Sequence, residues 1–357
     1  MTLENPTLIL PSNAAEQAGE ITCKCPSNIA IIKYWGKHGV QLPRNPSISF
    51  TLNNAFTETK LTYSIKEKFD HKIDLEFYFE GKENEAFRAK QLKFLNTLLP
   101  VFPFLTQVHL KIESHNSFPH SAGIASSASS MAALAMCLCT LENRLFVENT
   151  EGYDFLKKSS YIARIGSGSA CRSVYPTMAV WGKCADVEGS SDEYAVPFEN
   201  EIHEVFKTFH DDILIASRGE KSVSSRMGHG LMDNNPYAEP RYAQARSRMS
   251  AVIAALKTGD VETFGQICED EAMTLHALMM TNSPWFTLLK PNTLKMIEIL
   301  RGYREATKTP VFFSLDAGPN LHVLYPHAVE TDVKMLITNE LQQYCENEQV
   351  IYDSVAP

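Results

Sequence analysis

Two turns made of small residues, each joined to a helix-like segment, most constrain the fold of this chain. The first turn runs from Pro119 to Ser127 and leads into Ala128–Leu141, whose Ala, Leu and Met content is typical of a buried helix. The second turn, Gly166–Ser169, follows a helix predicted over Glu151–Ile165. Glycine allows backbone bends that a side chain would block, and a helix start exposes N–H groups that attract anions. Both turns are therefore candidates for phosphate binding.

The common nucleotide-binding motifs are absent from the sequence. It contains no Gly-x-x-x-x-Gly-Lys-Ser/Thr loop, and Ile165–Arg172 begins like a dinucleotide fingerprint but has Cys171 where the third glycine belongs. A Rossmann domain is excluded on this ground. On the residues alone, a serine N-cap explains the first turn as well as a phosphate site does. A flexible turn beside a solvated arginine is the alternative for the second.

The order of segments along the chain predicts an α+β protein. Short β-like runs dominate the first hundred residues, and a second β/α pattern begins after residue 205. The predicted strands are Ile21–Cys25, Ser47–Leu52, Thr57–Ser64, Lys72–Phe79, Thr106–Ser114, Thr177–Trp181, Asp212–Ser217, Val311–Leu315 and Leu321–Tyr325. The further predicted helices are Asn84–Leu98, Tyr242–Lys257, Val261–Met280, Pro291–Ala306 and Glu330–Tyr344.

A polar stretch over residues 187–200 marks the expected domain boundary, because it gathers glycine, serine and acidic residues. We expect a loosely ordered lead-in over residues 1–20, an N-terminal domain over 21–195 and a C-terminal domain over 205–357. A chain of 357 residues is long enough for two such domains.

The composition excludes several classes of function. Lys and Arg number 33 against 42 for Asp and Glu, a net charge of -9, which argues against a general nucleic-acid binder and a basic membrane-surface protein. The longest nearly apolar run, Met131–Leu141, is too short to cross a bilayer, and the first twenty residues lack a signal-peptide core. We therefore expect a cytoplasmic protein with no membrane partner. The eight cysteines form no Cys-x-x-Cys pair and are expected to be reduced.

Charged residues outside the two turns supply further candidates for chemistry. Arg172 offers a planar fork to a phosphate or carboxylate. Lys33 and Lys37 bracket a tyrosine and a tryptophan, whose rings lower the local dielectric and strengthen attraction for an anion. Asp316 directly follows an apolar strand, where it can orient or deprotonate a hydroxyl. Exposed lysines beside a core tryptophan, and an Asx turn at the aspartate, are the ordinary structural alternatives.

Together these segments resemble the diphosphomevalonate decarboxylases of the GHMP kinase superfamily. The resemblance spans about Ile21–Tyr325, most of the chain. It rests on Asn28–Lys37 with Leu42–Leu52, Ala122–Ser129, Ala163–Ser173, Glu271–Met279 and Leu315–Asn320. The Lys-Tyr-Trp-Gly-Lys, Gly-Ser-Gly-Ser-Ala-Cys-Arg and Asp-Ala-Gly-Pro-Asn blocks together indicate the decarboxylase branch, whereas the Gly/Ser turn alone would indicate only the superfamily.

The resemblance implies a two-domain GHMP-kinase-like fold, with a ribosomal-protein-S5-like N-terminal domain, a ferredoxin-like C-terminal domain and the active site in the cleft between them. It implies that ATP phosphorylates the tertiary 3-hydroxyl of (R)-5-diphosphomevalonate, which then loses phosphate and CO2 to give isopentenyl diphosphate. The expected cofactors are ATP and Mg2+, and a homodimer is expected. Two alternatives stay open: a decarboxylase of 5-phosphomevalonate, and a GHMP small-molecule kinase that phosphorylates mevalonate without decarboxylation.

The same resemblance implies roles for individual residues. Asp316 is the expected catalytic aspartate, Lys33 lies near the reacting end, and Arg172 fixes the carboxylate of the substrate. The expected substrate-binding residues are Tyr34, Lys37, Ser169, Arg172 and Ser225. The expected ATP-binding residues are Gly123, Ala125, Ser126, Ser127 and Ser129, with Ser127 as a Mg2+ ligand. The chain departs from the family pattern at His229, where methionine is usual, and at Asn282–Trp285, and both positions are candidates for lining the substrate pocket.

Overall fold

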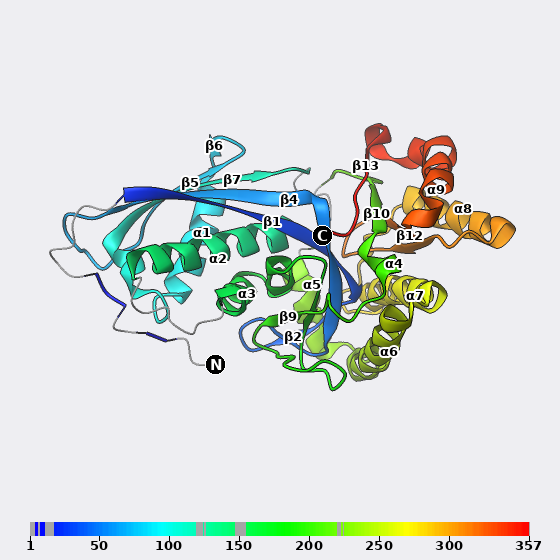
Figure 1. The fold of residues 1–357 in the computed structure, drawn as a ribbon, viewed down its shortest axis with the longest axis horizontal. Coiled ribbons are helices and arrows are strands. Elements are labelled where there is room, and N and C mark those ends of the chain that lie inside the picture. The colour runs from blue at the N-terminus through cyan, green and yellow to red at the C-terminus, as the bar shows by residue number, and fades with distance from the viewer. Residues whose placement is uncertain are drawn as a thin grey trace.

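Two β-sheets organise the chain, and helices pack against both (Figure 1). The computed structural model describes residues 4–5, 8–10, 18–118, 124, 126–146, 155–219, 223 and 225–356. The larger sheet contains, in spatial order, β6 (Lys82–Glu83), β5 (Asp74–Phe79), β7 (Val108–Asn116), β4 (Ser47–Ile65), β8 (Met178–Trp181) and β9 (Ala195–Pro197), with β1 (Ala18–Ile32) also paired to β4. The smaller sheet contains β11 (Phe312–Ser314), β12 (Leu321–Pro326), β10 (Phe209–Leu214) and β13 (Val350–Ile351). A short ribbon joins β2 (Lys37–His38) to β3 (Leu42–Pro43). The predicted α+β class is confirmed.

Strand β4 is one strand of 19 residues where the sequence predicted two, Ser47–Leu52 and Thr57–Ser64. The pair Asn53-Asn54 between them is exposed and reads as a turn. The backbone N–H groups of Asn53, Asn54 and Ala55 instead all donate to the Asp353 carboxylate, at 2.7 to 2.9 Å. This distant carboxylate satisfies the backbone there, so the prediction of two strands was wrong.

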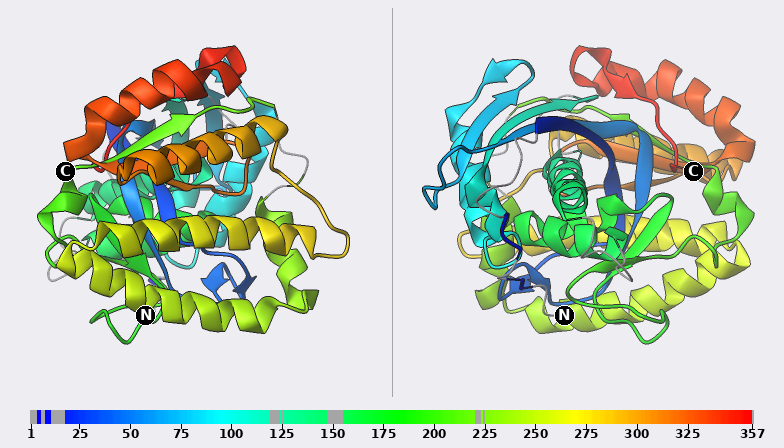
Figure 2. Two further views of the ribbon diagram at one scale, coloured as in Figure 1. Left: turned by 90° about the vertical axis from the view of Figure 1, so that its right-hand side faces the viewer. Right: turned by 60° about the vertical axis from the view of Figure 1, so that its left-hand side comes forward.

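Helices α1 (Glu85–Thr97), α2 (Ser126–Leu145) and α3 (Phe155–Gly166) lie on one side of the larger sheet (Figures 1 and 2). Asn84 caps α1 by accepting the backbone N–H of Phe87, as expected for a helix beginning there. Most alanines and leucines of α2 are fully buried, on all sides of the helix, which confirms the predicted buried helix. All eight cysteines are free thiols.

The stretch before β1 is packed in part. Leu8 and Leu10, which the sequence placed in a loosely ordered lead-in, are buried in the core of the larger sheet. The Gln107 side chain holds Leu10 on both sides, accepting its N–H at 2.8 Å and donating to its carbonyl at 3.0 Å. The sequence around Leu10 has no helical or strand-like periodicity, so it did not predict this contact with Gln107, which lies 97 residues away.

The second half of the chain is mostly helical: α7 and α8 pack against the smaller sheet, and α6 packs against α7 (Figure 2). Three predicted helices are confirmed with small changes in their ends, and α5 and α4 were missed because they are short. The helices are α4 (Glu204–Lys207), α5 (Ser225–Leu231), α6 (Ala238–Thr258), α7 (Val261–Met280), α8 (Pro291–Thr307) and α9 (Glu330–Leu336). The helix predicted to Tyr344 changes to a π turn at Ile337–Leu341 and then to a 3-10 turn. Within the described residues, no helix is long and apolar enough to cross a membrane.

A shared apolar core joins the two sheets. Phe50 of β4 packs against Phe209 of β10 and Phe264 of α7, with ring centroids 6.0 and 5.6 Å apart. Phe206 lies 4.8 Å from Phe264 in the same cluster. Since a large hydrophobic contact opposes free rotation of one part against the other, residues contributed by the two sheets hold fixed positions relative to each other.

Candidate active site

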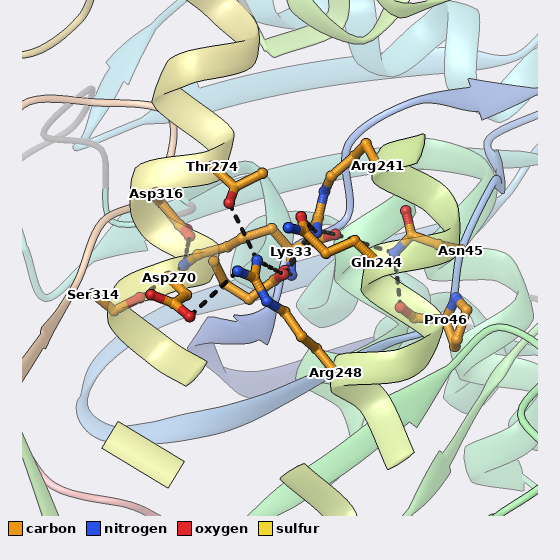
Figure 3. A network of polar contacts seen from close by, with 11 residues as sticks. Lys33, Asn45, Pro46, Arg241, Gln244, Arg248, Asp270, Thr274, Ser314 and Asp316 are labelled. Carbon is orange, nitrogen blue, oxygen red and sulfur yellow. Dashed lines mark hydrogen bonds and ion pairs between the residues drawn. The ribbon is translucent and has the colours of Figure 1, made fainter. Parts of the chain in front are cut away.

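An ion pair between Lys33 and Asp316 lies at the junction of the two sheets (Figure 3). Lys33 directly follows β1, and its Nζ donates to Ser314 Oγ at 2.9 Å and to Asp316 Oδ1 at 3.0 Å. The Lys33 side chain is 2% exposed, whereas the Asp316 side chain is 22% exposed. The ammonium is therefore fully enclosed, whereas the carboxylate remains partly exposed to solvent.

The backbone of Lys33 is fixed by a buried cluster of charges from α6 and α7. Its N–H donates to Glu271 Oε2 at 2.9 Å, and Glu271 also accepts from Arg241 and from Arg248 (2.9 Å). Burial acts to raise the pKa of the Glu271 carboxyl, but the charge and hydrogen bonds of Arg241, with Arg248, outweigh it and hold the pKa below its usual value. Asn45 and Arg241 donate to the Lys33 carbonyl at 3.2 and 3.4 Å. Lys33 is thus held on both sides of its Cα.

Sequence reasoning missed the two arginines of this cluster. Arg241 and Arg248 lie seven residues apart on α6, which places them on one face of the helix two turns apart. That spacing, together with the acidic pair Asp270-Glu271 in the next helix, was the available signal. Arg248 also pairs with Asp270 at 3.3 Å, so both acids of the pair are used.

Arg172 is buried beneath this junction, in the 3-10 turn Gly168–Val174. Its guanidinium donates to Ser49 Oγ at 2.9 Å, to Ser47 Oγ, and to Asn28 Oδ1 at 3.4 Å. Burial lowers the pKa of Arg172, and the charge of Asp316 is among those that raise it. The three hydrogen-bond partners are neutral, so they orient the guanidinium and leave its charge for an anion in electrostatic reach of Asp316.

Tyr34 and His229 form an aromatic wall beside Arg172. The Tyr34 ring lies 4.6 Å from the Trp181 ring and 4.3 Å from the His229 ring. Its hydroxyl is buried and has no hydrogen-bond partner within the described residues. A side chain on Gly168 would place Cβ 2.8 Å from that hydroxyl, so glycine is required there. An unpartnered buried hydroxyl is a ready donor for a ligand oxygen.

His229 of α5 holds the turn between Tyr34 and Lys37. Its Nδ1 accepts the backbone N–H of Gly36 at 3.0 Å, and Gly36 has a φ of 95° that favours glycine. Burial lowers the pKa of His229 to about 3, and the charge of Lys37 adds to the effect. The ring is therefore neutral at physiological pH, as an Nδ1 acceptor must be. Lys37 itself donates to Gln41 Oε1 at 3.0 Å.

The two small-residue turns meet at the start of α2. Ser126 and Ser127 begin the helix, and Ser127 Oγ lies 3.4 Å from Ser167 Oγ of the second turn. The Ser129 hydroxyl faces the sheet instead, 2.6 Å from Thr57 Oγ1, and is fully buried. It packs the helix start against β4, so it does not offer a free donor as the sequence interpretation expected. Gly123 and Ala125 lie outside the described residues.

A pocket of about 210 Å³ opens beside these serines. Ser126 and Ser127 belong to its lining, together with several aromatic rings. The remaining lining includes Phe77, Phe79, Phe87, Lys90 and Met131. Sequence reasoning indicated the two serines but none of the aromatic residues, because the rings come from β5 and α1, where each belongs to an ordinary apolar pattern.

The remaining predicted positions are distributed around the junction. The Ser169 carbonyl accepts Asn28 Nδ2 at 3.3 Å, close to Arg172. Ser225 begins α5, and its side chain lies outside the described residues. Trp285 is 69% exposed, so it does not line a buried pocket in this structure. Asn282 is buried and accepts from Asn235 at 2.6 Å, a structural contact within the helical layer.

Comparisons with known proteins identify relatives along most of the chain. Residues 25–195 match a family model described as the diphosphomevalonate decarboxylase-like N-terminal domain, and residues 212–355 match the mevalonate 5-diphosphate decarboxylase C-terminal domain. A diphosphomevalonate decarboxylase from Danio rerio is 31% identical over 327 residues, which cover 87% of this chain and 77% of the relative.

Solved structures agree with the family models. Mevalonate diphosphate decarboxylase from Staphylococcus aureus superposes with a TM-score of 0.79 at 30% identity, covering 95% of this chain and 96% of that one. The protein MDDEF in complex with MVAPP, AMPPCP and magnesium gives a TM-score of 0.78 at 30% identity, covering 96% and 98%. The expected two-domain GHMP-kinase-like fold is confirmed by these likenesses.

Proposed function

The chain belongs to the diphosphomevalonate decarboxylase family, and on that premise we propose that it catalyses the ATP-dependent decarboxylation of (R)-5-diphosphomevalonate. The products are isopentenyl diphosphate, CO2, ADP and phosphate. One observation carries the proposal: the partly exposed carboxylate of Asp316 is paired with Lys33 and lies within electrostatic reach of Arg172. This combination suits a substrate that carries both a hydroxyl and a carboxylate.

In the first step, Asp316 orients the tertiary 3-hydroxyl and accepts its proton as the γ-phosphoryl group passes from ATP to the hydroxyl oxygen. Phosphoryl transfer depends mainly on positioning and charge neutralisation. Lys33 holds one carboxylate oxygen at 3.0 Å and so fixes the direction of the other. The Lys33 ammonium also places a positive charge directly beside the carboxylate that is to accept the proton.

In the second step, Arg172 fixes the substrate carboxylate while phosphate leaves the tertiary carbon. Positive charge develops on that carbon, and the nearby Asp316 carboxylate stabilises it. The bond between the carboxylate and its neighbouring carbon then breaks, its electron pair forms the new double bond, and CO2 departs. Because the guanidinium is clamped by Ser47, Ser49 and Asn28, it holds the carboxylate in a single position.

We place the nucleoside of ATP in the aromatic-walled pocket and its phosphates at the start of α2. The pocket volume of about 210 Å³ suits a purine base, and the first N–H groups of a long helix favour phosphate. Mg2+ neutralises phosphate charge when bound, and it commonly keeps few protein ligands. The exposed Ser127 hydroxyl fits such a ligand.

The remaining assignments complete the proposal. Tyr34, Lys37, Ser169 and Ser225 surround the substrate phosphates, with the unpartnered Tyr34 hydroxyl as the main support. We assign residues 21–195 to an N-terminal domain and 205–357 to a C-terminal domain. A cytoplasmic location stays the expectation from the sequence, and a homodimer stays the expectation from the family resemblance.

The function is tested by supplying the purified protein with ATP, Mg2+ and one acid at a time. Diphosphomevalonate is expected to yield one CO2 per ADP, with kcat/KM at least about 10-fold above that for 5-phosphomevalonate, because each extra charge-assisted contact contributes about 1.5 kcal/mol or more. ADP release with a stable phosphorylated product would favour the kinase alternative. Faster CO2 release from 5-phosphomevalonate would favour the other decarboxylase.

Replacing His229 tests its role in holding the Gly36 turn. His229→Leu removes the Nδ1 acceptor and leaves a buried N–H unpaired, so KM for the acid is expected to rise about 10-fold with a smaller change in kcat. His229→Asn places an amide oxygen near the Nδ1 position and is expected to recover most of the affinity. Steady-state kinetics of both variants checks this. Equal KM values for His229→Leu and wild type would contradict the role of His229 in holding the turn.

The same variants change the dependence of stability on pH. His229 has a folded-state pKa of about 3, below its ordinary 6.5, so its stabilising contribution is present above pH 6.5 and is lost as pH falls toward 3. Between pH 7.5 and 5 the wild type is expected to lose about 2 kcal/mol more unfolding free energy than His229→Asn. Urea unfolding at the two pH values measures the difference.

A further inference from the structure

Three side chains that the proposed reaction does not use converge on the smaller sheet. His210 comes from β10, His327 follows β12, and Glu330 begins α9. His210 Nε2 lies 3.1 Å from His327 Nδ1 and 3.9 Å from Glu330 Oε2, and His327 Nδ1 lies 3.1 Å from Glu330 Oε2. Within the described residues, this is the group whose potential ligand atoms all fall within 4.8 Å of one another.

These separations match one face of a tetrahedral metal site. Zinc binds imidazole nitrogen and carboxylate oxygen at about 2.0–2.2 Å, so neighbouring ligand atoms in a tetrahedron lie about 3.3–3.5 Å apart. The observed values of 3.1, 3.1 and 3.9 Å bracket that range. A shift of a few tenths of an ångström would bring the three atoms to equal distance from one ion.

Neighbouring residues orient two of these three side chains, His210 and Glu330. The His210 ring stacks on Tyr325, with centroids 4.8 Å apart and planes 3° apart. Lys334 pairs with Oε1 of Glu330, which leaves Oε2 directed to the two imidazoles. The ring stacking and the lysine contact thus fix the directions in which His210 and Glu330 present these atoms.

We propose that His210, His327 and Glu330 form a site for Zn2+ or a similar borderline transition-metal ion. Two imidazoles and one carboxylate suit zinc better than magnesium, which prefers oxygen ligands. Each neutral imidazole carries its proton on either ring nitrogen, so both rings can present the facing nitrogen as a lone pair. His327 is 64% exposed, which leaves the fourth position to water.

The site lies far from the proposed reaction. His210 pairs with Tyr325 near one end of β12, and Leu214 pairs with Leu321 near the other end, which follows the Asp316 loop. The two pairs are four residues apart along each strand, or about 13 Å at about 3.3 Å per residue. A bound ion would join β10 to the start of α9 and stabilise the smaller sheet without entering the chemistry.

The test is titration of the metal-free full-length protein with zinc chloride by calorimetry, in a buffer without chelators. We expect one site whose affinity falls about 10-fold or more in His327→Ala and in Glu330→Gln. His115→Ala is the matched control: His115 is similarly exposed and also pairs with a carboxylate, that of Glu80, but belongs to no three-ligand group within the described residues. Zinc is expected to raise the Tm of wild type by a few degrees at about 100 times Kd, and not that of His327→Ala.

The outcomes separate this site from other zinc-binding groups of the chain. Cobalt(II) should give visible absorption bands typical of tetrahedral nitrogen and oxygen ligation, lost in His327→Ala. Sulfur-to-cobalt charge-transfer bands would assign binding to the free cysteines and overturn the proposal. So would zinc affinity that is unchanged in both His327→Ala and Glu330→Gln, or reduced equally in His115→Ala.

Discussion

Asp316→Asn is expected to lower turnover by about 100-fold or more, with no release of ADP or CO2 above background. Asparagine has nearly the same size and can still accept a hydrogen bond from Lys33, so the fold of the loop is retained. It carries no negative charge and cannot take the hydroxyl proton, so the first proposed step stops. Nucleotide binding, measured with a fluorescent ATP analogue, should stay within about 2-fold of wild type.

Asp270→Asn is the control for this result. Asp270 is also a carboxylate near the same charge cluster, but it is 44% exposed and pairs with Arg248 at 3.3 Å rather than with Lys33. Its turnover is expected to stay within about 3-fold of wild type, since exposed ion pairs contribute little. Retention of more than about a tenth of the activity in Asp316→Asn would remove this carboxylate from the chemistry.

Glu271→Leu is expected to lower the free energy of unfolding by about 3–5 kcal/mol. The substitution removes the acceptor for Arg241, Arg248 and the backbone N–H of Lys33, and the Arg241 side chain is 1% exposed. Leaving a buried guanidinium without its carboxylate partner lowers the free energy of unfolding far more than doing so at an exposed site. Urea denaturation followed by circular dichroism measures the loss.

Two further variants define what the Glu271 carboxylate does. Glu298→Gln removes an exposed partner of Lys295 and is expected to change stability by less than about 0.5 kcal/mol. Glu271→Gln keeps the shape but weakens the hold on Lys33, so its kcat should fall even where the protein remains folded. An unfolding free energy of Glu271→Leu within about 1 kcal/mol of wild type would contradict the role of this cluster.

The long helices could be predicted from the sequence because their signals are local. The observed bounds of α7 agree with the predicted Val261–Met280, and Asp260 caps it by accepting the N–H of Thr263. An apolar period and a cap lie within one segment, so nearby residues suffice to define such a helix. Strand β4 is different, because the contact that keeps it continuous is about 300 residues distant.

In the candidate site, too, some residues could be predicted from the sequence and others could not. The sequence motifs indicated Lys33, Arg172 and Asp316, and the structure places the first against the third and the second within reach of its charge. The sequence motifs did not indicate Arg241, nor the contact between Ser129 and Thr57. Both depend on side-chain contacts between segments that share no sequence pattern. The roles of these residues in catalysis stay predictions until the variants are measured.

The Asp353 carboxylate that holds residues 53–55 has a consequence for how this protein is made. A ribosome adds roughly 5–20 residues per second, so the 300 residues between Asn53 and Asp353 take about 15–60 s to synthesise. During that interval the backbone N–H groups of residues 53–55 in the nascent larger sheet have no acceptor from Asp353. Translation must pass residue 353 before these groups gain it, so β4 reaches its final form late, after the smaller sheet has begun to emerge.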